Sequence, residues 1–88
     1  MTAKQKYIQD NRLGRLSKKQ KELIFCYEPW LSIDSCAVSA IYQIFGCYEN
    51  DVFSARMEYA RQKATPIYDD GKHIGTVVDM RGYMDAIE

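Results

Sequence analysis

Residues 32–78, SIDSCAVSAIYQIFGCYENDVFSARMEYARQKATPIYDDGKHIGTVV, decide the fold. Apolar side chains recur every three or four residues along two stretches, which predicts one helix over 34–45 and a second from residue 50 or 51 to 64. Asp34 is the expected N-cap of the first helix, and Gly46 lies where a left-handed residue commonly ends a helix. The tetrapeptide Asp69-Asp70-Gly71-Lys72 then predicts a β-hairpin, because glycine can adopt the positive φ of a tight turn. The expected order is therefore helix, turn, helix and hairpin.

The side chains expected in the interior are apolar and share one side of each predicted helix. They are Ala37, Val38, Ile41, Ile44 and Phe45 in the first helix, and Phe53, Met57, Ala60 and Ala64 in the second. With this side turned inward, the second helix presents outward Asp51, Ser54, Glu58, Arg61 and Gln62, with Arg56 and Lys63 on the flanks. The second helix is therefore the element expected to present a contact surface.

A further helix is predicted before this stretch. Ser17 and Gln20 have the spacing of a capping box, which satisfies free backbone amides at a helix start. The apolar face of this helix would comprise Leu23, Ile24 and Tyr27. Pro29 disfavours the helical conformation of the residue before it, so the helix is expected to end near Tyr27 or Glu28.

A short amphipathic helix is predicted at the C-terminal end of the sequence, with Asp79 as a candidate N-cap. Met80, Tyr83, Met84 and Ile87 follow at the i, i+3, i+4, i+7 spacing of one helix face. This apolar stripe could pack on the core of its own chain or on a second copy. A homodimer through these four residues is therefore one of two expected arrangements.

These elements together predict an α+β domain of the winged helix-turn-helix class, with a three-helix core, a β-hairpin wing and a short C-terminal helix. Eighty-eight residues leave no room for a second core. Residues 17–88 are expected to form the single domain, and residues 1–16 a basic N-terminal segment preceding it.

A resemblance supports this fold. The residues that carry it are Ser32-Ile33-Asp34, Ala37, Ile41, Phe45-Gly46-Cys47, Ala55-Arg56-Met57, Ala60-Arg61, Pro66-Ile67 and Gly71-Lys72. In this pattern the chain resembles a group of small phage and prophage helix-turn-helix proteins. The resemblance implies a winged helix that binds double-stranded DNA as an accessory regulator. The chain departs from the pattern at residues 49–51, Glu-Asn-Asp, where those proteins tend to carry a basic residue.

The net charge is zero, but the charges are unevenly distributed. Residues 1–22 carry seven basic and two acidic side chains, whereas residues 23–88 carry five basic and ten acidic ones. A basic segment of this kind is expected to seek a polyanion or an acidic surface. The candidate nucleic-acid contacts are Arg12, Arg15, Lys18, Lys19 and Lys21 for affinity, with Tyr7 nearby for stacking, and Arg56, Arg61 and Lys72 for reading DNA.

The acidic body supports a second hypothesis of a different class. The second predicted helix and the wing carry Glu49, Asp51, Glu58, Asp69 and Asp70. This acidic face could dock on a basic surface of a host nucleic-acid enzyme or defence complex, as anti-CRISPR-like inhibitors do. The charge pattern favours this hypothesis, whereas the resemblance favours DNA binding.

Several functions have no support in the sequence. His73 is the only histidine, and no nucleophile motif or cofactor loop is present, so neither an enzyme nor a cofactor is expected. Cys26, Cys36 and Cys47 are ten and eleven residues apart with no close pair, which argues against a zinc site and for a reduced, intracellular protein. No apolar run of about 18 residues exists, so no membrane partner is expected and the predicted location is the cytoplasm.

Overall fold

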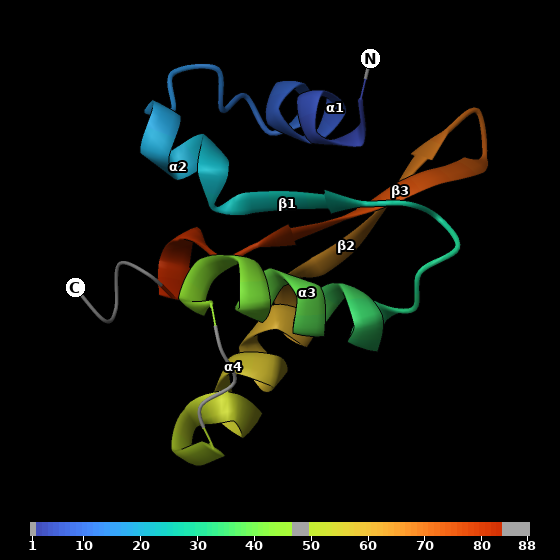
Figure 1. Ribbon diagram of the computed structural model, residues 1–88. Helices are drawn as coiled ribbons and strands as arrows, with labels where there is room; N and C mark the ends of the chain where they lie inside the picture. The colour runs from blue at the N-terminus through green and yellow to red at the C-terminus, as the bar shows by residue number, and fades with distance from the viewer. Residues whose placement is uncertain (1, 47–49, 84–88) are drawn as a thin grey trace.

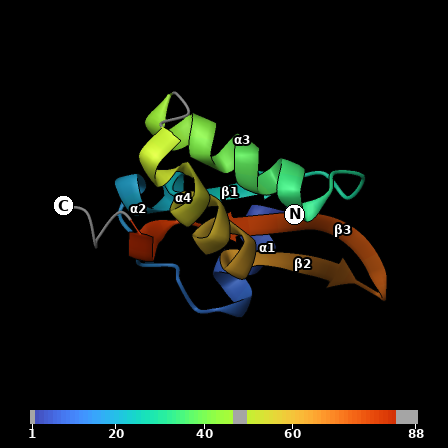
Figure 2. The ribbon, with the colours of Figure 1, turned by 90° about the horizontal axis from the view of Figure 1, so that it is seen from below.

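The computed structural model describes residues 2–46 and 50–83. The helices are α1 (Ala3–Asp10), α2 (Lys18–Glu22), α3 (Ile33–Phe45) and α4 (Asn50–Lys63), and the strands are β1 (Ile24–Tyr27), β2 (Ala64–Asp69) and β3 (Lys72–Asp79). The strands form one antiparallel sheet with β3 in the centre, between β1 and β2. Helices α1 and α2 lie on one side of this sheet, and α3 and α4 on the other (Figures 1 and 2). The domain is therefore α+β.

The predicted helix over 34–45 is confirmed, but its cap is different from the one expected. Ser32, and not Asp34, is the N-cap: its hydroxyl accepts the amide of Ser35 at 3.1 Å. Asp34 lies in the first turn, where a negative charge is favourable because free amides point toward it. Gly46 has a φ of 71° and ends the helix, as predicted.

The helix predicted from Ser17 to Tyr27 is wrong in its second half. Its capping box is present, since the amide of Gln20 donates to Ser17 at 3.1 Å and the amide of Ser17 donates to Gln20 at 3.2 Å. The helix nevertheless ends at Glu22, and residues 24–27 form β1. These residues, Ile-Phe-Cys-Tyr, are β-branched or aromatic at three of four positions, which suits a strand. They pair with residues 76–79 of β3, a partner that local periodicity does not reveal.

The predicted hairpin is confirmed. Asp70 and Gly71 both have positive φ, 50° and 78°, as a two-residue turn between twisted strands requires. Strands β2 and β3 pair along their length: Asp69 lies opposite Lys72 beside the turn, and Ala64 lies opposite Val78 at the far end. Pro66 lies in β2, which is an edge strand and therefore tolerates a residue without a backbone N–H.

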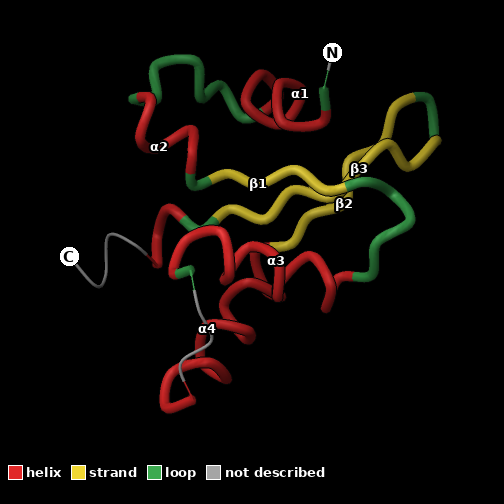
Figure 3. The backbone as a smooth tube through the Cα atoms, viewed as in Figure 1, coloured by secondary structure: helices red, strands yellow, loops and turns green. Residues whose placement is uncertain are grey.

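Helices cover both faces of the sheet (Figure 3). An apolar cluster of side chains fills the space between helices and sheet on each face. The larger one, under α3 and α4, contains the buried side chains of Tyr27, Cys36, Ala37, Ala40, Ile41, Met57, Ala60, Val78 and Met80. The expected interior residues Val38, Ile44, Phe45, Phe53 and Ala64 pack against it while partly buried. The inward faces predicted for both helices are therefore confirmed.

The C-terminal stripe begins in the core of its own chain. Met80 is fully buried, and Tyr83 packs its ring against Phe45 and Tyr59. The proposed homodimer contact through Met80 is therefore wrong, because the side chain is not accessible to a second copy. Met84 and Ile87 lie outside the described residues.

The smaller cluster joins α1 to the other face of the sheet. Ala3, Ile24, Ile67 and Val77 are buried in it. Helix α1 packs closely on β3 at Gly75. A Cβ added to Gly75 would lie 2.9 Å from the Ala3 Cβ and 2.9 Å from the Tyr27 carbonyl oxygen. Glycine is therefore required for α1 to pack at this depth.

Candidate nucleic-acid interface

The outward face of α4 is as the sequence predicted. Ser54, Glu58, Arg61 and Gln62 are all exposed. Arg61, however, is held by α3, since its Nε lies 2.8 Å from Oδ1 of Asp34. The pair leaves Arg61 accessible, but it matches the positive charge with a negative one and weakens the attraction to a phosphate.

Arg56 does not face outward, so its assignment as a DNA contact is wrong. The residue is only 8% exposed, and its guanidinium carbon lies 3.4 Å from the centre of the Phe45 ring. Phe45 is the last residue of α3, so this contact places Arg56 on the side of α4 that faces the end of α3. A cation over an aromatic face is stabilised by the negative potential of the ring, so Arg56 serves the packing of the two helices.

The β2–β3 hairpin, which is the predicted wing, has a mixed charge. Lys72 is exposed at the start of β3 and stands directly across the ladder from Asp69. Asp70 is exposed in the turn. Three charges of mixed sign at one tip leave little net attraction for a polyanion.

The acidic face is described only in part. Glu58, Asp69 and Asp70 are exposed, as the inhibitor hypothesis requires. Glu49 lies outside the described residues. Asp51 belongs to α4, but its side chain is outside the described part.

The predicted affinity residues lie on one continuous stretch of the chain, in the segment between α1 and α2 and in α2 itself. Arg12, Arg15, Lys18 and Lys19 are exposed and Lys21 is half-buried. We call these five residues the basic strip. Arg12 has a φ of 56° in the turn after α1, and this reverses the chain toward α2. The strip belongs to the α1–α2 side of the sheet, whereas the main length of α4 projects on the other side (Figure 1).

A cleft that the sequence did not predict opens between α2 and the C-terminal end of α4. Its volume is about 610 Å³. We call it the polar cleft, and it is lined by Tyr7, Gln20, Tyr59, Gln62, Lys63, Thr65, Asp79, Arg81 and Gly82. Residues from both ends of the described sequence therefore contribute to one concave surface.

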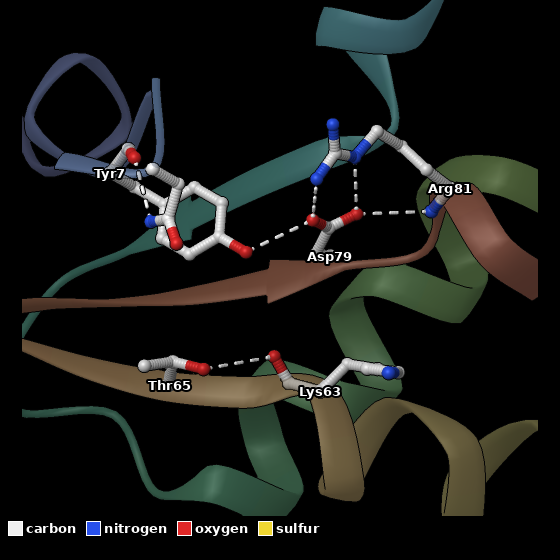
Figure 4. Close-up of polar contacts among 6 residues, drawn as sticks. Tyr7, Lys63, Thr65, Asp79 and Arg81 are labelled. Carbon is white, nitrogen blue, oxygen red and sulfur yellow. Dashed lines mark hydrogen bonds and ion pairs between the residues drawn. The ribbon is translucent and has the colours of Figure 1, made fainter. Parts of the chain in front are cut away.

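Asp79 organises one wall of the polar cleft. Tyr7 and Arg81 approach its carboxylate from opposite sides (Figure 4). The Tyr7 hydroxyl donates to Oδ2 at 3.1 Å, the Arg81 Nε donates to Oδ1 at 2.8 Å, and Nη2 of Arg81 donates to Oδ2. The backbone amide of Arg81 donates to Oδ1 at 3.1 Å, so Asp79 caps the turn that follows β3, as its sequence position suggested.

These contacts fix the charges in the wall. Burial disfavours the ionised carboxylate, but the hydrogen bonds and charge of Arg81 outweigh it and lower the pKa of Asp79. The hydrogen bond to Asp79 in turn raises the pKa of Arg81. Burial and the nearby carboxylate raise the pKa of Tyr7, which therefore stays protonated and remains a donor. The wall holds one compensated ion pair at neutral pH.

Sequence reasoning missed Asp79 and Arg81 as members of a site. Tyr7 and Asp79 are 72 residues apart, and no spacing rule connects them. The local sequence around Asp79 and Arg81 is Asp-Met-Arg, at the end of a predicted strand. This order indicates at most that Asp79 caps the next turn and forms an ion pair with the residue two positions later.

No protein-family model, curated protein or solved structure matches this chain. Among residues 2–46 and 50–83, no helix is long and apolar enough to cross a membrane. Within the same residues, no three His, Cys, Asp or Glu side chains gather as a metal ion would require.

Proposed function

We propose that this protein is a winged-helix DNA-binding protein that holds double-stranded DNA through the basic strip. The fold part of the proposal is supported by α3, α4 and the β2–β3 hairpin, which follow one another as a helix-turn-helix and its wing do. The third strand, β1, pairs with the hairpin and joins it to the helical core. DNA binding is supported by one observation: five cationic side chains fall within a span of ten residues, 12–21, which includes the turn after α1 and most of α2.

The surface that usually reads bases contributes little here. Arg56 is buried, Arg61 is paired with Asp34, and Lys72 faces Asp69 across the wing. Contacts to phosphates supply affinity without sequence information, whereas base edges are read by unpaired donors in a groove. We therefore expect binding that depends strongly on salt and only weakly on DNA sequence.

The direct test is fluorescence anisotropy with a 20-bp duplex between about 50 and 300 mM salt. Three to five phosphate contacts give a slope of log K against log salt of about −3 to −4.5. The double variant Arg12→Ser/Arg15→Ser should reduce this slope by about 2 and weaken binding at least tenfold, while the matched control Lys72→Gln should change neither. Absence of binding at 50 mM salt, or an equal loss in the control, would contradict the proposal.

A second function has its own supporting observation. Glu58, Asp69 and Asp70 are exposed on α4 and the wing, and pairing with Asp34 removes the nearby positive charge of Arg61. This face suits a basic protein surface, as an inhibitor of a host nucleic-acid enzyme would need. Either function places the protein inside a cell.

Capture from nuclease-treated host lysate separates the two. An inhibitor should retain a protein partner after nuclease treatment, lose it on Glu58→Lys, and keep it in Arg12→Ser/Arg15→Ser. A DNA-binding protein should show the reverse dependence, with capture abolished by the nuclease and by the double variant.

A further inference from the structure

We propose that the polar cleft binds a nucleoside monophosphate unit, either a free nucleotide or the 5′ end of a nucleic-acid strand. This goes beyond duplex binding by the basic strip, because none of the five residues of the strip lines the cleft. The cleft has a volume of about 610 Å³. Small-molecule sites commonly measure about 300–1,000 Å³.

The charge of the cleft favours an anion. Lys63, Arg81 and Asp79 are the charged residues that line it. Asp79 is fully engaged by Arg81 and Tyr7, so its negative charge is compensated within the wall. The Nη1 atom of Arg81 faces away from the carboxylate (Figure 4). The cleft therefore keeps one net positive charge and guanidinium and ammonium donors for a phosphate.

The rest of the lining suits a nucleoside. Tyr7 and Tyr59 line the cleft and are both partly exposed, which offers aromatic surface beside which a nucleobase can pack regardless of its identity. Gln20 and Gln62 supply side-chain amides, which can donate to and accept from the edge of a base. The Lys63 ammonium lies 5.7 Å from the centre of the Tyr59 ring, so a cation and an aromatic surface are adjacent. Inorganic phosphate would use the cations but neither the rings nor the amides.

The test is a set of NMR titrations of the full chain with 5′-AMP, inorganic phosphate and a 5′-phosphorylated tetranucleotide. Addition of 5′-AMP should shift the amide signals of Gln20, Gln62 and Thr65, with a dissociation constant at least tenfold lower than that of phosphate. A lower constant for the tetranucleotide than for 5′-AMP identifies a strand end as the ligand, and the opposite order identifies a free nucleotide. Equal binding of phosphate and 5′-AMP would overturn the proposal.

Two lysine variants locate the site. Lys63→Gln should weaken 5′-AMP binding at least tenfold, whereas Lys72→Gln, at the tip of the wing, should leave it unchanged. Tyr59→Leu should weaken 5′-AMP but not phosphate, and amide spectra of each variant verify that it is folded. Equal losses in both lysine variants, or no shift up to about 10 mM 5′-AMP, would refute the proposal. The Arg12→Ser/Arg15→Ser variant should keep 5′-AMP binding, so failure of the duplex proposal is measured separately.

Discussion

The two faces of the sheet are stabilised in different ways. Among residues 2–46 and 50–83, the face under α3 and α4 buries nine side chains in one apolar cluster, whereas the face under α1 buries four. Neighbouring residues of β3 serve both, since Val77 points to the α1 side and Val78 to the α3–α4 side. The α1 side adds a close contact at Gly75 and the polar contacts of Tyr7 with Asp79. The global stability of the domain should therefore depend mainly on the face under α3 and α4. The docking of α1 on the other face should depend on a few specific contacts.

The largest effect is expected from a cavity in the larger cluster. Ile41 is fully buried there, and Ile41→Ala should cost about 3 kcal/mol of unfolding free energy. Ile67→Ala, on the α1 face at 8% exposure, should cost about half as much because the smaller cluster can collapse around the gap. Urea denaturation of both variants measures the difference, and equal costs would remove the contrast between the faces.

The polar wall should give the next largest effect. Asp79→Asn leaves Arg81 without its counter-charge and should cost about 2 kcal/mol at pH 7, below the range for fully buried pairs because the Arg81 side chain is 21% exposed. The folded pKa of Asp79 is lowered, so its contribution is complete above the unfolded value of about 3.9 and is lost as the pH falls through the folded pKa.

The difference in stability between the wild-type protein and Asp79→Asn should therefore shrink as the pH falls below about 3.9 and through the folded pKa of Asp79. Urea midpoints at several pH values measure it. A difference that stays constant over this range would show that the Asp79 carboxylate is not the linked group.

A smaller and more local effect is expected at Gly75. The methyl group of Gly75→Ala would meet Ala3 and the backbone of Tyr27, so α1 must shift away, at a cost of about 1–2 kcal/mol. Hydrogen exchange should quicken in α1 while α3 and α4 keep their protection. Gly14→Ala is the matched control, because a Cβ at Gly14 has no neighbour within 4 Å. Uniformly faster exchange would mean that the two faces unfold together.

The smallest effect is expected from the ion pair between α4 and α3. Asp34 and Arg61 have side-chain exposures of 68% and 49%, so solvent screens them. Arg61→Ala should cost about 0.5 kcal/mol or less. A double-mutant cycle with Asp34→Ala isolates the pair, and a coupling above about 1 kcal/mol would show that it holds the two helices together.

The local signals of the sequence predicted much of the fold and less of the site. The Asp70-Gly71 turn, the capping box at Ser17 and the glycine stop at Gly46 are all present. Each depends on residues at most three positions apart, whose geometry is fixed by backbone sterics and nearby hydrogen bonds. The exposure of Glu58 and Arg61 followed from helical periodicity alone.

The errors arose where a distant segment decided the outcome. Leu23, Ile24 and Tyr27 have a spacing that suits a helix. In the structure, however, each of residues 24–27 pairs with a residue of β3, and this distant partner makes the segment a strand. Arg56 lies at the flank of a helical wheel, and only the end of α3, with Phe45, makes that flank an interior position.

By itself the sequence determined where the chain turns, which helix faces are apolar and where its cations gather, because these depend on intervals of a few residues. Only the tertiary structure decided that residues 24–27 are a strand, that α1 packs on the sheet, and that Tyr7 meets Asp79 in the wall of a cleft. Such contacts join segments far apart along the chain. Their free energy comes from surfaces that exist only after the other segments have folded.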